Sequence, residues 1–332
     1  MSTRLHRLAA LAVLLAFCVV VLGAWVRLSH AGLGCPDWPG CYGQLTWPNA
    51  PHEVADANQA FPERPVETHK AWKEMLHRYL AGALVLVVLA LNVLAWRGGP
   101  HERRHRGITA LLLALIVFQA LLGMWTVTLK LLPVVVMAHL LGGMATLALL
   151  TWLWLRSRTA PHDPTRQAIS ARPLVLTALA VLVLQIALGG WVSANYAALS
   201  CPDLPTCNGQ WWPDADFAEG FVLWREVGVD YEGGVLDQRA RTAIQLAHRV
   251  GAVITLLVLA LVSFALMRRP VLARAGVVLL LAVAAQFTLG VLNVVLYLPL
   301  PNAVAHNAGA AVLLMLLTWL LHRTNRQRAA VG

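Results

Sequence analysis

The chain has 332 residues, of which 58% are hydrophobic and 13% are charged. Soluble globular domains are about 45–50% apolar and about 25% charged, so this composition argues against a soluble enzyme. The apolar content excludes a disordered chain. A nucleic-acid-binding protein is disfavoured, because the formal net charge of +10 would need a soluble surface on which to form a basic patch. The remaining class is a protein that crosses a membrane several times.

Eight apolar runs are long enough to cross a bilayer, which takes roughly 20 mainly apolar residues. In chain order they cover about 8–28, 74–96, 108–128, 134–155, 174–194, 246–267, 271–296 and 302–321. A proline stands just before four of these runs, at a position where the start of a helix tolerates it. The sequence therefore predicts an all-α polytopic membrane protein with eight transmembrane helices.

Basic residues gather on one side of the predicted membrane. They lie before the first run, between the second and third, the fourth and fifth, and the sixth and seventh runs, and after the last one. The only acids in these segments are Glu102 and Asp163. Because cytoplasmic loops carry an excess of Lys and Arg, we expect both termini in the cytoplasm. The acidic loop 214–239 then lies outside, where we expect an ordinary solvated loop.

The two halves of the chain repeat one pattern of residues. The pattern Trp25, Cys35, Cys41 and Gln44 recurs in the same order and spacing as Trp191, Cys201, Cys207 and Gln210. Gln119 and Gly123 recur likewise as Gln286 and Gly290. This predicts two tandem, pseudo-symmetric four-helix bundles, in residues 1–160 and 161–332. An even number of spans in each unit makes the repeat parallel, with an axis near the membrane normal.

Four of the five cysteines lie in two loops of the form Cys-Pro-Asp-x-Pro-x-Cys on the predicted outer side. Because the outer compartment is oxidising, we predict two local disulfides, Cys35–Cys41 and Cys201–Cys207. One metal ion bound by all four thiols is an alternative, although the spacing is unlike the usual Cys-x2-Cys of zinc sites. The sequence does not separate a structural from a redox-active disulfide.

Four of the twelve histidines lie inside the apolar runs, one on each even-numbered run: His77, His139, His248 and His306. All four runs begin on the outer side, so at 1.5 Å per residue the imidazoles fall at a similar shallow depth. Each histidine is followed three or four positions later by a small residue on the same helix face, which leaves room for a large flat group. Ionisable residues within membrane spans are candidates for function.

Two histidines on facing helices of each bundle suit bis-imidazole ligation of a haem iron. Zinc or copper usually takes a third or fourth protein ligand. Arg78 and Arg249 directly follow two of the histidines. Such arginines can anchor a helix at the membrane surface or donate to haem propionates. We favour the second interpretation, because both arginines occupy the same place in the repeat.

One position breaks the symmetry of the repeat. Glu74 lies one helical turn before His77, whereas its counterpart in the second half is Gln245. A carboxylate beside a haem ligand can take up or deliver protons, which an amide cannot do. Glu74 is therefore the candidate catalytic residue and the N-terminal half the candidate site of reaction. The alternative is an interfacial carboxylate paired with Lys70, Lys73 or Arg78.

These residues resemble a known family, the bacterial haem A synthases and the related mitochondrial cytochrome-oxidase assembly enzyme. The resemblance covers essentially the whole chain. It rests on the paired cysteine loops, the two four-helix halves and the residues Glu74-x-x-His77-Arg78, His139, His248-Arg249 and His306. It implies an enzyme that oxidises the C8 methyl group of haem O to a formyl group by successive hydroxylations. The product is haem A for terminal oxidases.

The resemblance also implies which residues hold which group. A haem B cofactor is expected on His248 and His306, and the substrate haem O on His77 and His139, with Glu74 as the catalytic residue. The expected location is the bacterial inner membrane, with the cysteine loops outside.

The partners expected from the resemblance are haem O, the lipid bilayer, and transiently haem O synthase and oxidase assembly factors. No nucleic acid is expected, and a homo-oligomer stays open. The alternative function is a dihaem, b-type, quinol-linked electron-transfer protein. It explains the four histidines equally well, but not Glu74 against Gln245. A haem transporter with two transfer sites is a third interpretation.

Overall fold

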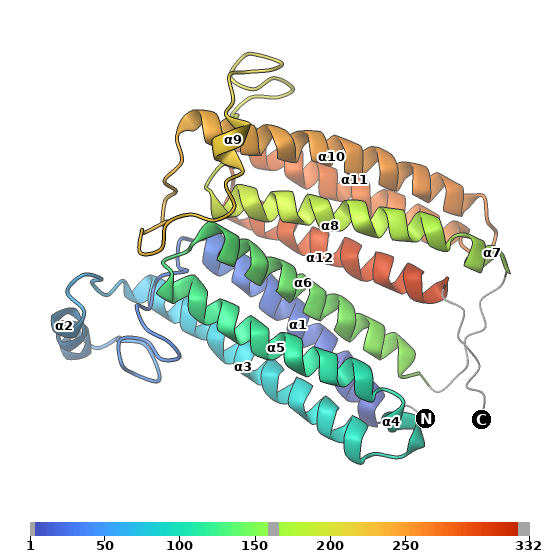
Figure 1. Ribbon diagram of the computed structural model, residues 1–332, viewed down its shortest axis with the longest axis horizontal. Helices are drawn as coiled ribbons and strands as arrows, with labels where there is room; N and C mark the ends of the chain where they lie inside the picture. The colour runs from blue at the N-terminus through green and yellow to red at the C-terminus, as the bar shows by residue number, and fades with distance from the viewer. Residues whose placement is uncertain (1–3, 159–165, 325–332) are drawn as a thin grey trace.

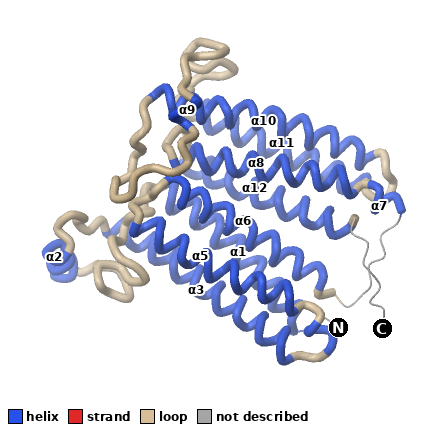
Figure 2. The backbone as a smooth tube through the Cα atoms, in the orientation of Figure 1, coloured by secondary structure: helices blue, strands red, loops and turns tan. Residues whose placement is uncertain are grey.

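The computed structural model describes residues 4–158 and 166–324 (Figures 1 and 2). In this part of the chain the regular elements are helices, and eight of them are long and apolar enough to cross a membrane. They are α1 (Arg4–Leu28), α3 (Thr68–Arg97), α5 (Arg106–Thr128), α6 (Pro133–Arg156), α8 (Arg172–Ala194), α10 (Gln238–Met267), α11 (Ala273–Val295) and α12 (Leu300–Arg323). The predicted all-α membrane protein with eight transmembrane helices is confirmed. The predicted boundary between residues 160 and 161 lies outside the described residues.

Two helices, α3 and α10, begin several residues before the apolar runs that predicted them. Their first turns are polar, and the N–H groups of a first turn have no partner within the helix, so caps or water must satisfy them. The start of α10 is capped by Asp237, whose carboxylate accepts from the backbone N–H of Ala240 at 2.8 Å. As a consequence, Glu74 and Gln245 lie inside helices and not at their beginnings.

The long helices lie side by side in two groups of four (Figure 1). In the N-terminal group, α3 and α6 both pack on α1 and α5. In the C-terminal group, α10 and α12 both pack on α8 and α11. The four helices that carry the candidate histidines therefore stand in two pairs, and the members of each pair face each other across their group. The groups meet where α1 and α6 pack on α12, and α6 on α8.

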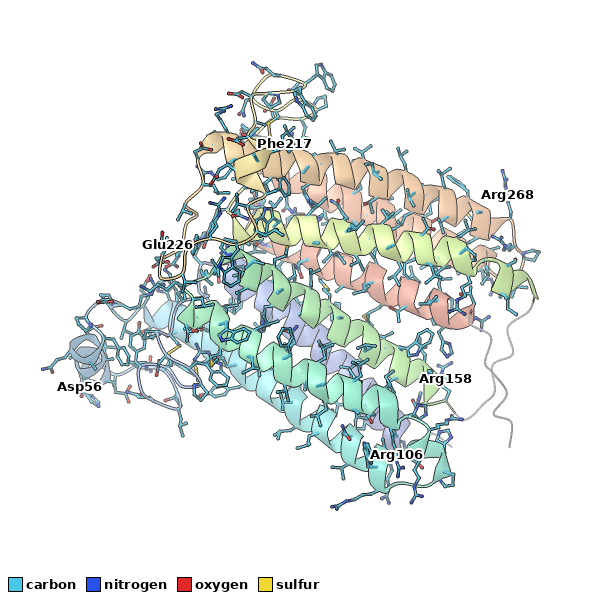
Figure 3. All side chains as sticks on the ribbon, in the orientation of Figure 1. Asp56, Arg106, Arg158, Phe217, Glu226 and Arg268 are labelled. Atoms are coloured by element: carbon cyan, nitrogen blue, oxygen red, sulfur yellow. A yellow bond between two sulfur atoms is a disulfide. The ribbon has the colours of Figure 1, made fainter. Side chains whose placement is uncertain are left out.

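The remaining helices are short and lie at the two ends of the bundle. They are α2 (Pro51–Ala60), α4 (Pro100–Arg103), α7 (Arg166–Ser170) and α9 (Phe217–Gly220). α2 and α9 lie at the end that carries both cysteine loops, and α4 and α7 at the opposite end (Figure 1). Figure 3 shows Arg106, Arg158 and Arg268 at the α4 end, whereas Asp56 and Glu226 lie at the other. The charges are thus separated along the bundle axis.

The acidic loop before α10 contacts the N-terminal group. Tyr231 is 3% exposed, and its backbone N–H donates to the carbonyl of Lys130 at 3.0 Å. Arg64 pairs with Glu232 at 2.7 Å and with Asp230 at 3.5 Å. The expectation of an ordinary solvated loop is therefore wrong for these residues. The partners come from distant parts of the chain, so the composition of the loop could not reveal them.

Candidate functional site

Both cysteine loops are closed by disulfides, with S–S distances of 2.04 Å for Cys35–Cys41 and 1.91 Å for Cys201–Cys207. The two predicted disulfides are confirmed. Inside the second loop, the carboxylate of Asp203 accepts hydrogen bonds from the hydroxyl of Thr206 and from the backbone N–H groups of Asn208 and Gly209. These hydrogen bonds, chiefly the one from Thr206, lower the pKa of Asp203 to about 2. The loop is therefore held by an ionised carboxylate at ordinary pH.

An arginine fastens each cysteine loop to the helix beneath it. Arg78 donates to the carbonyls of Asp37 at 2.9 Å and Pro39 at 3.3 Å, and also to that of Gly40. Arg249 makes the equivalent bonds in the second half, to the carbonyls of Cys201 at 2.6 Å, Thr206 at 2.8 Å and Asp203 at 2.9 Å. Neither interpretation of these arginines from the sequence included the loop carbonyls. Contact with haem propionates stays a prediction.

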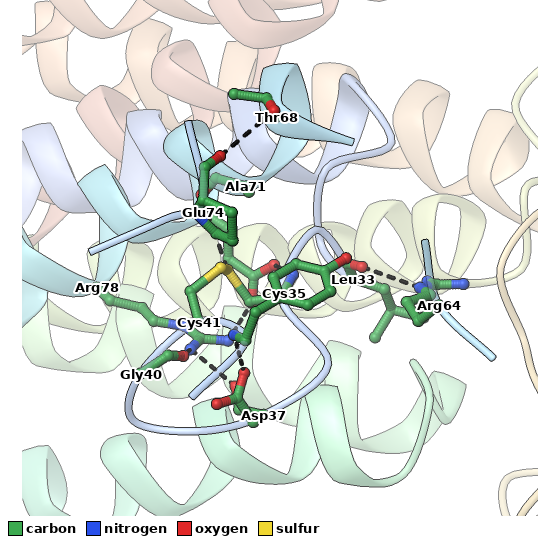
Figure 4. The surroundings of a disulfide bond; sticks show 12 residues. Leu33, Cys35, Asp37, Gly40, Cys41, Arg64, Thr68, Ala71, Glu74 and Arg78 are labelled. Atoms are coloured by element: carbon green, nitrogen blue, oxygen red, sulfur yellow. Dashed lines mark hydrogen bonds and ion pairs between the residues drawn. A yellow bond between two sulfur atoms is a disulfide. The ribbon is translucent and has the colours of Figure 1, made fainter. Parts of the chain in front are cut away.

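Glu74 is held in place from both of its oxygens (Figure 4). Oε1 lies 2.5 Å from Nη2 of Arg78, and Oε2 accepts from the backbone N–H of Cys35 at 3.0 Å. The residue is 5% exposed. Of the three ion-pair partners considered from the sequence, the structure pairs it with Arg78. Because that pair also fixes the direction of the carboxylate, it does not argue against a chemical role.

The equivalent place in the second half holds an amide with an unsatisfied oxygen. Gln245 is 4% exposed, and its Oε1 has no hydrogen-bond partner. Arg249 therefore binds only its loop, whereas Arg78 binds both its loop and a carboxylate. The asymmetry expected from the sequence is thus a difference between a buried ion pair and a buried amide.

The four candidate histidines lie on α3, α6, α10 and α12, and each ring packs against a glycine of a neighbouring helix. A Cβ atom at Gly23 would lie 2.9 Å from Cε1 of His77, and one at Gly123 would lie 3.4 Å from Cε1 of His139. In the C-terminal group, a Cβ atom at Gly189 would lie 3.2 Å from Cε1 of His248, and one at Gly290 would lie 3.1 Å from Cε1 of His306. A methyl group at Gly23 would displace the ring, and one at Gly189 or Gly290 would press against it. The sequence analysis noted two of these glycines but gave them no role.

The rings form two pairs that match the two groups of helices. His77 and His139 lie on α3 and α6, and His248 and His306 on α10 and α12, which face each other across their groups. In the described residues, no group of three or more His, Cys, Asp or Glu side chains could hold a metal ion. Nδ1 of His77, His139 and His306 is buried without a hydrogen-bond partner. Paired imidazoles with unsatisfied nitrogens, on helices that face each other across a bundle, could serve as the protein ligands of a haem iron.

Three glutamines accompany the histidines, and the sequence analysis gave none of them a role. Nε2 of Gln185 lies 3.0 Å from Nδ1 of His248, and Nε2 of Gln286 donates to the carbonyl of His306 at 2.9 Å. The third is Gln119, which lies against the helix of His139. The available signal was a motif Gln-x-x-Leu-Gly at 119–123, 185–189 and 286–290. Comparison of single helices, and not only of the two halves, would have found it.

The family model described as "Cytochrome oxidase assembly protein" (COX15-CtaA) matches residues 6–318. The chain belongs to this family. It is 45% identical over 302 residues to the "Heme A synthase" of Shewanella oneidensis, with 90% of each chain covered. It is 29% identical over 324 residues to that of Allorhizobium ampelinum, which covers 92% of this chain and 86% of the relative. With that of Caulobacter vibrioides it shares 30% identity over 336 residues and 93% of each chain. Family membership and eight apolar helices make it a multi-pass membrane protein.

Proposed function

We propose that this protein is a haem A synthase, which oxidises the C8 methyl group of haem O to a formyl group. The names of its relatives support an enzyme of this kind. The observation that carries the proposal is the combination of two histidine pairs with one buried carboxylate, Glu74, beside only one of the pairs. A protein that merely conducts electrons between two haems has no need of this difference.

The N-terminal half, residues 1–160, binds the substrate in this proposal. His77 and His139 face each other across the group and take the iron of haem O as axial ligands. Glu74 lies one helical turn before His77, so its carboxylate is next to the substrate site. The salt bridge to Arg78 and the bond from the N–H of Cys35 keep it in one orientation. Glu74 can therefore accept a proton as the methyl group is hydroxylated.

The C-terminal half, residues 161–332, holds a haem B cofactor on His248 and His306. When bound, this group supplies one-electron redox chemistry to the reaction. The residues of this half then have only to keep it in place. Gln245 accepts no proton at the position of Glu74, which leaves this half without substrate chemistry.

The separation of charge along the bundle supports the orientation proposed from the sequence. The arginine-rich end with α4 and α7 faces the cytoplasm, together with both chain termini. The cysteine loops and the site of Glu74 then lie toward the outer surface of the bacterial inner membrane. Haem O synthase and oxidase assembly factors are the transient partners we propose, because haem O must arrive and haem A must leave.

The test is the pigment made by cells that produce haem O and express the protein. We expect haem A to accumulate, and the variant Glu74→Gln to retain haem without forming haem A. Glu67→Gln is the control, since Glu67 is an exposed carboxylate just before the same helix. Haem A formation by Glu74→Gln would contradict the assignment of Glu74. Two equivalents of haem B, no haem A and full reduction by quinol would favour the dihaem electron carrier instead.

A further inference from the structure

The motif Gln-x-x-Leu-Gly occurs on three of the four helices whose glycines pack against a histidine ring. On α5, α8 and α11 it reads QALLG, QIALG and QFTLG, and the equivalent residues on α1 read VVVLG. In each motif the glutamine lies one helical turn before the glycine. His139, His248 and His306 thus have a glutamine on the neighbouring helix, whereas His77 has Val19 at that place.

The three glutamines contact the helices of their histidines. Gln185 places Nε2 3.0 Å from Nδ1 of His248 and donates to its carbonyl at 3.1 Å. Gln286 places Nε2 3.5 Å from Nε2 of His306 and donates to the carbonyl of that residue at 2.9 Å. The amide of Gln119 lies where a Cβ at Gly142, one turn after His139, would stand. Each amide therefore contacts the helix of one histidine, and the amides of Gln185 and Gln286 also lie next to the ring.

Each of the three amides has one atom whose hydrogen-bonding capacity is unused. Oε1 of Gln185, Oε1 of Gln286 and Nε2 of Gln119 are buried without partners. An imidazole that binds a metal through one ring nitrogen carries its proton on the other, and an acceptor for that proton fixes the ring. For Gln185 and Gln286, a half-turn of the terminal amide gives up the bond to the backbone carbonyl and turns the oxygen toward the ring, where it can accept this proton. The isopropyl group of Val19 can present none.

We propose that Gln119, Gln185 and Gln286 are positioning residues for three of the four haem ligands, and that His77 is the ligand that releases. This inference rests on the proposed function. Both ligands of the cofactor half then have a supporting amide, which suits a group that stays bound. The substrate half has one supported and one unsupported ligand, and its haem must be exchanged in every cycle. The asymmetry of the glutamines thus parallels the asymmetry of Glu74.

Two reciprocal variants at equivalent positions test the proposal. Val19→Gln adds the missing amide, and Gln185→Val removes the amide beside His248. The full-length protein, purified with haem in both halves, is reduced and exposed to carbon monoxide, which binds only where a ligand has left. Haem transfer to apomyoglobin is measured on the same samples. Neither readout requires activity.

We expect carbon monoxide to bind one haem per chain in the unmodified protein, and less in Val19→Gln. Gln185→Val should make the second haem reactive and raise its rate of transfer by about 10- to 100-fold, the usual effect of removing such a support. Gln286→Val repeats this loss at the other cofactor ligand, and Val19→Leu controls for the change of side-chain volume.

Unchanged carbon monoxide binding and transfer rates in Val19→Gln and Gln185→Val, with both haems present, would overturn the proposal. The proposal would also be overturned if Val19→Leu reduced carbon monoxide binding as much as Val19→Gln does. Failure of the proposed function has a different signature. In that case cells that make haem O would form no haem A with the unmodified protein, whatever the carbon monoxide binding of the variants.

Discussion

The two equivalent arginines allow the cost of a buried, unpaired carboxylate to be measured inside one protein. Arg78 and Arg249 hold their loops by similar bonds to three backbone carbonyls, but only Arg78 also pairs with a carboxylate. Replacing either arginine by alanine removes the bonds to the loop. Arg78→Ala additionally leaves Glu74 buried beside a loop that offers it a single N–H.

The expected difference follows from the geometry of the pair. Glu74 and Arg78 lie 2.5 Å apart, with side chains that are 6% and 12% exposed. Removing one partner of a buried ion pair costs about 3–5 kcal/mol, because the other charge stays desolvated. The lost carbonyl bonds are common to both variants and cancel in the comparison. We therefore expect Arg78→Ala to lower the free energy of unfolding by about 3–5 kcal/mol more than Arg249→Ala does.

Denaturant unfolding of the full-length protein in detergent, followed by tryptophan fluorescence, measures this difference. The double variant Glu74→Gln/Arg78→Ala should recover most of this additional loss, because it no longer contains the unpaired charge, although the bonds to the loop carbonyls stay absent. Equal losses in Arg78→Ala and Arg249→Ala would refute the reasoning. The reasoning would also be refuted if the double variant were no more stable than Arg78→Ala.

Three further outcomes follow from other parts of the molecule. Burial, reinforced by nearby arginines, lowers the pKa of His105 to about 4. As the pH falls, the unfolded chain takes up this proton before the folded protein does, so the free energy of unfolding decreases between about pH 6.5 and pH 4. In His105→Gln the free energy of unfolding should depend less on pH in this range. Tyr231→Ala removes a buried ring that joins the two groups of helices and should cost roughly 3–5 kcal/mol, measured as a lower unfolding midpoint. Gly23→Ala puts a methyl group 2.9 Å from the ring of His77 and should reduce bound haem, whereas Gly82→Ala, with open space around it, should not.

The choice of membrane helices was already fixed by local composition. Each run of apolar residues must cross the bilayer as a helix, because its backbone groups have no other partners in hydrocarbon. For the same reason the ends of α5, α6 and α8 agree with the predicted runs within two residues. The starts of α3 and α10 were missed because polar residues also form helices outside the bilayer, where hydropathy carries no signal.

The disulfides were equally local, since six residues separate the cysteines of each pair. Glu74 and the four histidines stood out because charged and titratable groups are costly in an apolar span. Nothing local indicated that Arg78 binds the cysteine loop, or that Arg64 binds the acidic loop. Those contacts depend on how distant segments meet, and surface charges alone do not specify their partners.

The sequence by itself determined which residues are chemically unusual: four histidines and one carboxylate within apolar helices, and two cysteine pairs in similar loops. Only the tertiary structure decided what each of them touches. It placed a glycine against each of these four histidine rings, an amide against the helices of three of them, and Arg78 between Glu74 and the disulfide loop. The physical reason is that helix formation and membrane insertion depend on neighbouring residues, whereas the environment of a buried polar group is set by packing between helices that are far apart in the chain.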